Sequence, residues 1–412
     1  MSSAPGERWS DEFLDSMRQV TDPELDDIIG AYFDPAEEAQ PGGGHAALRI
    51  LQPYLDQWNK PVPQEPPQGV PEASRPGWAL ISQFFQTPIN YPNWVDHDKI
   101  RLAEDLFVSY GPVTTAVLLL NAVPHFFTNP AGARSFYMAQ IFGKKSLENR
   151  MVQVPQFVVN IGQRGGLAQL GMPGPPAWFE KGPGIITVQK LRMAHAGIRV
   201  RLKGMHSGLQ AEPGRCGKLV WEVSEFGQPI NQEDLAEALM HFCLTTIDGL
   251  RKAGIDQTRQ EDEAMFNAWK TVGFLLGLRE DLQPRTIEEG LWLRDAIFRR
   301  HSRSTCDAGA LIDQMLTIVA AFLPFHLKSL PAALMRYQLG PEVADMVQVP
   351  DPRLWVWLIT MLRAIWKKDK LFAKLAKWIS PHLVEWLVTH PVGDSEEVKF
   401  HIPRSLRQSW NV

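Results

Sequence analysis

The chain contains little cysteine and no motif that would use it. Its 412 residues include only three cysteines, Cys216, Cys243 and Cys306, and no two of them form a Cys-x-x-Cys pair. We therefore expect neither a zinc site nor a disulfide framework. Unpaired thiols are typical of a reducing compartment, so the cysteine content favours a cytoplasmic protein.

An excess of one charge and a long apolar run are also missing. The formal net charge is −4, which gives no global basic field to attract nucleic acid. The apolar stretches 114–127 and 311–327 are too short, or too interrupted by polar residues, to predict a transmembrane helix. The first residues contain neither an apolar core nor a twin arginine, so we expect no export signal.

Alternating strand patterns and common catalytic motifs are absent too. The sequence contains no His-Glu-x-x-His zinc motif and no Gly-x-Ser-x-Gly nucleophile elbow. Apolar residues instead recur at helical spacing, which predicts an all-α protein. The expected helices after residue 90 are 98–109, 112–127, 131–142, 146–163, 184–203, 231–253, 258–278, 285–302, 306–325, 331–339, 351–367 and 370–390.

The first 90 residues have a different organisation. Short helices are expected near 11–20, 23–33 and 46–58, and the stretch 59–77 holds six prolines, which predicts an extended connection. We therefore divide the chain into an N-terminal helical region with its Pro-rich connection (1–90) and a larger helical domain (91–412).

The predicted helix 184–203 carries the most informative pattern. Arg192 and Arg199 lie about one turn before and after His195 and share its side of the helix. Two nearby cations disfavour protonation of an imidazole, and a neutral imidazole can bind a metal. Guanidinium groups can bind the anionic edge of a cofactor. Small neighbours such as Ala194 and Ala196 let a flat ligand approach the backbone. Haem meets these demands; the alternative is a basic, solvent-facing helix.

The same residues resemble a known family. Arg192-x-x-His195-x-x-x-Arg199 is similar to the signature helix of the latex clearing protein (rubber oxygenase) family. Further similar blocks are Trp221 with 227–235, then 269–277 and 400–406, so the resemblance covers roughly residues 90–410. Family members are all-helical, globin-like b-type haem proteins, and the studied ones cleave isoprenoid double bonds with dioxygen. A related fungal oxygenase of the mycophenolic acid pathway cuts a prenyl side chain.

The resemblance implies roles for four residues. His195 is expected to be the proximal iron ligand, with Arg192 and Arg199 holding the propionates or stiffening the helix. Arg150 is expected on the distal side, where its charge would stabilise negative charge developing on oxygen. Gln153 and Val154 then stand where the family has Lys and Thr. That departure predicts a distal side unlike that of the rubber-cleaving members.

We therefore expect a globin-like helical core with extra helices at both ends, and a haem b oxygenase that uses dioxygen on an apolar alkene or isoprenoid-type small molecule. The absence of an export signal favours a small substrate over polymeric latex. Two alternatives are a haem enzyme of non-oxygenative or peroxidase-type chemistry and a non-catalytic haem-binding protein. The loop 165–183, with Trp178 and Phe179, either covers one cofactor edge or is an ordinary surface connection.

Three other patterns have structural explanations that we prefer. Asp96 next to His97 predicts a helix cap rather than a metal site. Glu237 and His241 lie one turn apart and predict a pair, either an ion pair or a hydrogen bond, rather than a metal site. The segment 351–390 joins an apolar stripe to a run of lysines. It predicts either weak membrane-surface association or, as we favour, packing on the core with solvated lysines.

Overall fold

Helices form all the regular structure that the computed structural model describes, apart from one isolated bridge between Gln169 and Lys181. It describes residues 5–33, 46–142, 147–169, 181–204, 216–217, 220–321, 323–366 and 401–410. The predicted all-α class is confirmed. Its globin-like character and the boundary near residue 90 remain predictions. The expected helix 370–390 lies outside the described residues.

The first part of the chain begins with short helices and ends with α10, which lies alongside α11. Its elements are α1 (Pro5–Arg8), α2 (Asp11–Met17), α3 (Pro23–Tyr32), α5 (Ala46–Asp56), the 3-10 turn η1 (Glu72–Ser74), α6 (Arg75–Gln86), α7 (His97–Val117), the π-helix η2 (Leu118–Ala122), α8 (Val123–Phe126), α9 (Pro130–Phe142) and α10 (Leu147–Gly162).

The rest of the described chain supplies the site helix and the central helices. Its elements are α11 (Pro183–Gly204), α12 (Val223–Phe226), α13 (Gln232–Met240), the π-helix η3 (His241–Thr245), α14 (Thr246–Lys252), α15 (Arg259–Leu275), η4 (Glu280–Leu282), α16 (Ile287–His301), α17 (Cys306–Ala321), η5 (Phe325–Leu327), α18 (Leu330–Leu339), α19 (Pro341–Met346), α20 (Arg353–Trp366) and α22 (Arg404–Trp410).

Side-chain caps fix where several helices begin. The Asp96 carboxylate accepts the backbone N–H groups of Asp98 and Lys99, which confirms its predicted capping role at α7. Asn231 caps α13 in the same way, and Thr258 forms a reciprocal capping box with Glu261 at α15. Each cap satisfies an N–H group that has no partner inside its own helix.

α7 runs through a proline and continues into η2 and α8, so the prediction of two helices, 98–109 and 112–127, is wrong. Pro112 has no N–H to offer the carbonyl of Val108. The indole N–H of Trp410 on α22 donates to that carbonyl instead, at 2.9 Å. The continuous helix His97–Phe126 is long and apolar enough to cross a membrane, but 72% of its apolar window is buried inside the protein.

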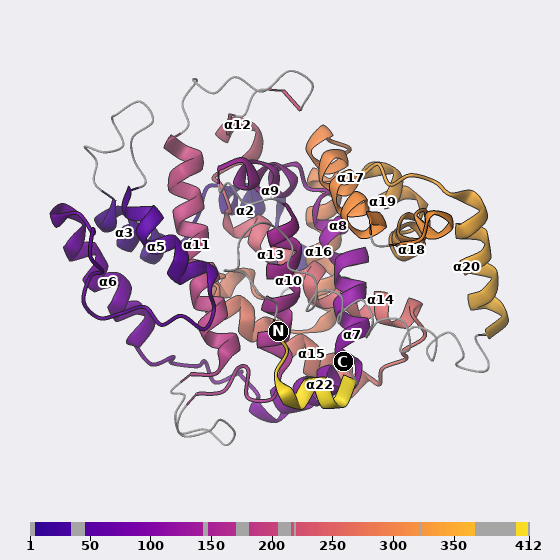
Figure 1. Ribbon diagram of the computed structural model, residues 1–412, viewed down its shortest axis with the longest axis horizontal. Coiled ribbons are helices and arrows are strands. Elements are labelled where there is room, and N and C mark those ends of the chain that lie inside the picture. The colour runs from indigo at the N-terminus through magenta and orange to yellow at the C-terminus, as the bar shows by residue number, and fades with distance from the viewer. Residues whose placement is uncertain are drawn as a thin grey trace.

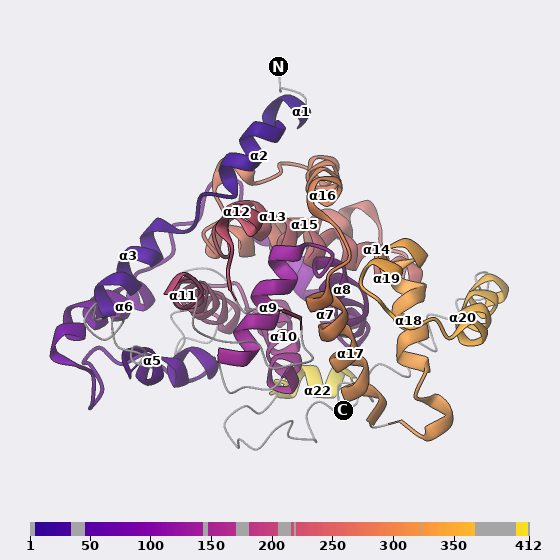
Figure 2. The same ribbon diagram turned by 90° about the horizontal axis from the view of Figure 1, so that it is seen from above.

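The buried side chains form one main cluster and two smaller ones. The main cluster joins α7, α10, α13, α15 and α17, and the second joins α3, α5 and α6 to one face of α11. A third, small cluster contains Met138 of α9, Leu202 of α11 and Trp221. Figures 1 and 2 show α11 lying between α3, α5 and α6 on one side and α9 and α10 on the other. α11 therefore lies at the boundary of all three clusters.

The expectation that all three cysteines are unpaired is wrong. Cys216 and Cys306 form a disulfide, with a Cα–Cα distance of 5.4 Å and 90 residues between them in the sequence. Cys243 is free and buried. The pair is invisible in the sequence because helix packing, not a short motif, brings the two residues together. The argument for a reducing compartment loses the support of these two cysteines.

Candidate functional site

The start of α11 is fixed by a close approach to the end of α10. A Cβ atom on Gly184 would lie 2.7 Å from the carbonyl oxygen of Gly166 and 2.8 Å from that of Asn160. Only a residue without a side chain fits here. The amide of Asn160 donates to Thr187 across the same contact, at 2.8 Å. α10 is thereby held alongside α11, as a wall of any site on this side of the helix.

Two buried lysines, one on α11 and one just before it, bind backbone carbonyls of the N-terminal region. Lys181 donates to the carbonyl oxygens of Phe85 and Thr87, and Lys190 donates to those of Gln57 and Lys60. Burial lowers the pKa of Lys190 to about 7. These bonds satisfy backbone carbonyls at the end of α6 and at the start of the Pro-rich connection, and so dock both against α11.

His195 faces the main body of the protein. On an α-helical wheel, four apolar residues lie within roughly 60° of it: Val188, Leu191, Ile198 and Leu202. The first two belong to the main cluster and the last two to the small third cluster. The opposite side of α11, with Met193, Ala196 and Val200, packs on the N-terminal helices. His195 is half-buried, at the point where the main and third clusters part.

Arg192 is held by carboxylates of the N-terminal region. Its Nε and Nη2 atoms donate to the two oxygens of Asp22 at 2.6 and 2.8 Å, and Nη2 also donates to Glu24 at 2.8 Å. This two-pronged geometry is the strongest arrangement open to a guanidinium and a carboxylate. Of the two predicted roles for Arg192, the described contacts correspond to stiffening of the helix.

Arg199 is bound differently. Its Nε donates to Asp26 at 2.6 Å, and its side chain is only 3% exposed. Its Nη2 atom is buried and has no hydrogen-bond partner among the described residues. A buried, charged N–H donor without a partner costs free energy unless a ligand or water accepts it. Arg199 therefore keeps a donor available one turn from His195.

The other predicted site residues lie on α10 and in the loop before α11, and only some of their side chains are described. Arg150 belongs to α10, the wall beside α11, but its side chain lies outside the described part of the structure, as do Trp178 and Phe179. The side chains of Gln153 and Val154 on the same helix are half-buried.

These observations fit a haem group. The half-buried imidazole of His195 is a suitable iron ligand, and the Nη2 of Arg199, which has no partner among the described residues, is a suitable donor to a propionate. Among the described residues no cluster of three His, Cys, Asp or Glu side chains could hold a metal ion by itself.

A buried group of acids on α13 was not recognised from the sequence as a cluster. Glu233 is paired with Arg18, Arg300 and His301 at 3.0 to 3.4 Å. Asn129 donates to both Asp234 and Glu237. The signal was present in the acidic residues at the beginning of the predicted helix 231–253.

Burial shifts the pKa values of this cluster. It raises the pKa of Asp234 and that of Glu237 to about 7 and lowers that of His241 to about 3. Glu237 Oε1 and His241 Nε2 lie 3.7 Å apart, and neither has a hydrogen-bond partner among the described residues. The predicted Glu237–His241 pair is therefore close in space, but the two side chains are not directly hydrogen-bonded.

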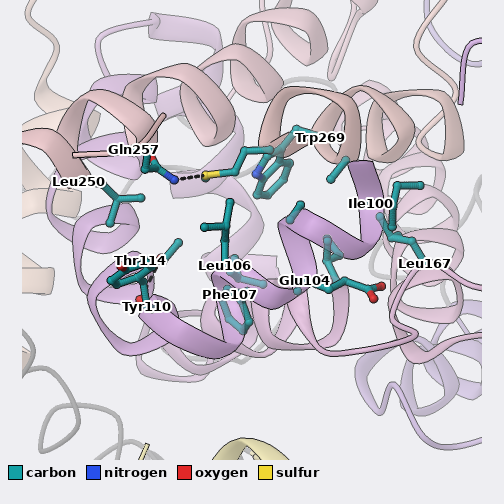
Figure 3. Close-up of a pocket in the computed structure, with 16 residues that line it drawn as sticks. Ile100, Glu104, Leu106, Phe107, Tyr110, Thr114, Leu167, Leu250, Gln257 and Trp269 are labelled. Carbon is teal, nitrogen blue, oxygen red and sulfur yellow. Dashed lines mark hydrogen bonds between the residues drawn. The ribbon is translucent and has the colours of Figure 1, made fainter. Parts of the chain in front are cut away.

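An apolar cavity of about 50 Å3 lies between α7, α10 and α15 (Figure 3). Phe107, Val158, Leu167 and Trp269 contribute to its lining, and Glu104 is its charged residue. Burial raises the pKa of Glu104 to about 7, and its carboxylate accepts the backbone N–H of Gly165 at 3.0 Å. No residue of α11 lines the cavity, and small-molecule sites usually enclose about 300 Å3 or more. We therefore assign Glu104 to anchoring the loop after α10.

Comparison with known proteins gives consistent results. Residues 182–365 match the family described as ER-bound oxygenase mpaB/B'/Rubber oxygenase, catalytic domain. Over 330 residues the chain is 22% identical to the rubber oxygenase of Streptomyces sp. (strain K30). That alignment covers 80% of this chain and 70% of the Streptomyces protein. The latex clearing protein LCP in its closed state is similar in structure, with a TM-score of 0.62 and 19% identity. That match covers 96% of this chain and 91% of the other, and extends the likeness in fold beyond the family match.

Proposed function

We propose that this chain, whose residues 182–365 match the mpaB and rubber oxygenase family, uses a b-type haem and dioxygen to oxidise an apolar alkene. The match to that family supports an oxidoreductase of the oxygenase type. The cofactor, the ligand residues and the substrate class are our inferences. The observation that supports them best is the half-buried His195 with the unpartnered donor of Arg199 one turn away, on the helix at the boundary of three apolar clusters.

The chain's own residues would do three things. His195 would bind the iron, and Arg199 would donate to a propionate. The apolar residues around His195 would exclude water and favour a hydrocarbon substrate, since burying each methylene group contributes about 0.8 kcal/mol. The haem, when bound, would supply the chemistry that activates dioxygen. Arg150 on α10 is the residue we propose for stabilising negative charge on the distal side.

The cofactor assignment is tested by absorbance of the purified protein loaded with haem. Changing His195 to Ala should abolish the Soret band of the wild-type complex and leave the helix content, measured by circular dichroism, unchanged. The matched control is His326→Ala, which removes an exposed histidine on η5 and should keep the spectrum. An unaltered Soret band in His195→Ala would refute the assignment.

The reaction is tested with labelled dioxygen. Incorporation of label into carbonyl products of short prenyl compounds would support the proposed oxidation of a small alkene. Products from polyisoprene latex alone would assign the chain the substrate named for its Streptomyces relative. Turnover without label would favour non-oxygenative haem chemistry.

A further inference from the structure

An apolar stripe on α20 has no partner among the described residues. Leu354, Trp357, Leu358 and Met361 are 74%, 57%, 37% and 37% exposed. They follow one another at helical spacing and fall within about 100° of the helix circumference. We call these four residues the α20 stripe. They make up four of the six exposed large apolar residues of the described chain, whereas the other two, Leu80 and Val223, lie on separate elements.

The rest of α20 explains why this stripe stays outside. Ile359, on the opposite side of the helix, is buried, and α20 packs on α18. Figures 1 and 2 place α20 at the edge of the molecule, away from α11 and the N-terminal helices. One side of α20 therefore packs on α18, as the preferred prediction for 351–390 requires, whereas residues 367–390 lie outside the described part of the chain. A contiguous exposed apolar face on a monomer usually marks an interaction site.

The charge pattern identifies the kind of partner. In the sequence directly after Trp366, five lysines occur within eleven residues, interrupted by one acidic residue, Asp369. The lysines are Lys367, Lys368, Lys370, Lys374 and Lys377. Lysines next to an amphipathic helix favour an anionic lipid surface, because they are attracted to its negatively charged headgroups. A protein partner with a matching apolar groove would not require this concentration of one charge.

The dimensions of the helix agree with binding in the plane of a membrane. The apolar run that α20 carries ends in the sequence at Lys367, so it is too short to span the hydrocarbon core of a bilayer. A helix with an exposed apolar stripe, a tryptophan in that stripe and basic residues nearby is typical of peripheral binding at the headgroup level.

We propose that the α20 stripe docks this protein on the surface of an anionic lipid bilayer. The stripe would enter the boundary between headgroups and acyl chains, with Trp357 as its central anchor. The attraction of the following lysines to lipid phosphate and carboxylate groups would add to the apolar contact. This inference does not depend on the haem or on the proposed oxidation.

Vesicle flotation with the full chain tests the proposal. Wild-type protein should float with vesicles of phosphatidylcholine and phosphatidylserine, and added salt should weaken the binding because it screens the lysines. The double variant Leu354→Gln with Trp357→Gln should bind at least about tenfold more weakly. The matched control is Leu80→Gln with Val223→Gln, which removes as many exposed apolar side chains elsewhere and should bind like wild type.

Three results would overturn the proposal. One is the absence of wild-type binding to the anionic vesicles. Another is equal binding by the stripe variant and the control. The third is a wild-type dimer in light scattering that the stripe variant converts to a monomer, which would make the stripe a contact between two copies. Circular dichroism of both variants verifies that their folds are intact.

Discussion

Arg192 and Arg199 look equivalent in the sequence, but the structure separates their roles. Asp22 and Glu24 occupy the fork of Arg192, whereas Arg199 binds only Asp26 and keeps a buried donor without a described partner. The difference follows from where α3 lies, which the spacing on α11 does not reveal. It allows one arginine to serve as the matched control for the other.

We therefore expect Arg199→Gln to lower haem affinity by roughly ten- to hundredfold, because a charged hydrogen bond contributes about 1.5–3 kcal/mol. Arg192→Gln should lower stability but leave haem affinity nearly unchanged. Titration of the haem-free variants with haem, followed by absorbance, measures both. Equal losses of affinity would show that the free donor of Arg199 has no special part in binding.

The buried acid Glu237 predicts a pH dependence of stability. Burial raises its pKa from 4.5 to about 7, so between these values the folded state holds a proton that the unfolded state has released. Its contribution to stability is therefore present below about pH 4.5 and is lost as the pH rises through 7.

Glu237→Gln removes this titration. We expect it to stabilise the protein more at pH 8 than at pH 5, by about 1–3 kcal/mol. The amide would also offer an N–H to His241 Nε2, which has no partner among the described residues. Urea unfolding at the two pH values gives the difference. A variant whose effect is the same at both would mean that Glu237 is ionised in the folded protein.

At the scale of elements, α7 shows how a distant helix can compensate for a proline. The sequence predicts a break near Pro112, since proline usually interrupts a helix. The helix continues because the carbonyl of Val108 accepts the indole N–H of Trp410, 302 residues away. The break was predicted from a local rule, and a tertiary contact overrides it.

A double-mutant cycle tests this contact. Trp410→Phe should cost about 1–3 kcal/mol, because it leaves the half-buried carbonyl of Val108 without a donor. In a Pro112→Ala background the restored backbone N–H should satisfy that carbonyl, so the same Trp410→Phe change should cost measurably less. Chemical unfolding of the four proteins gives the coupling free energy. Equal costs in both backgrounds would show that the indole contributes by packing alone.

At the scale of the whole molecule, the Cys216–Cys306 disulfide joins α17 to the chain that leads from α11 to α12. Linking residues so far apart restricts the unfolded chain, which typically stabilises a protein by about 2–4 kcal/mol. We expect Cys306→Ser to lower the free energy of unfolding by that amount in the absence of reductant.

Alkylation and mass spectrometry of unreduced, unfolded wild-type protein provide the direct measurement. One modified cysteine, Cys243, is expected because the other two are paired. Modification of all three cysteines would show that the disulfide is not formed. Reduction before alkylation is the control that makes every thiol reactive.

The sequence by itself determined the features that depend on local chemistry. Helical periodicity predicted the all-α class, and Asp96 was recognised as a cap because a cap bonds to backbone within three residues. The Arg192–His195–Arg199 face followed from the pitch of one helix, and its likeness to the latex clearing protein family was visible in the same residues.

Only the tertiary structure decided the contacts between residues far apart in the chain. Packing joins Cys216 to Cys306 in a disulfide and brings the indole N–H of Trp410 to the carbonyl of Val108. It also places Asn129 beside the acids of α13 and gives Arg192 and Arg199 different partners. The physical reason is the same in each case. Such contacts depend on how helices pack, and packing is set by the complementarity of many side chains at once. The spacing of residues within a single segment does not reveal how that segment packs against others.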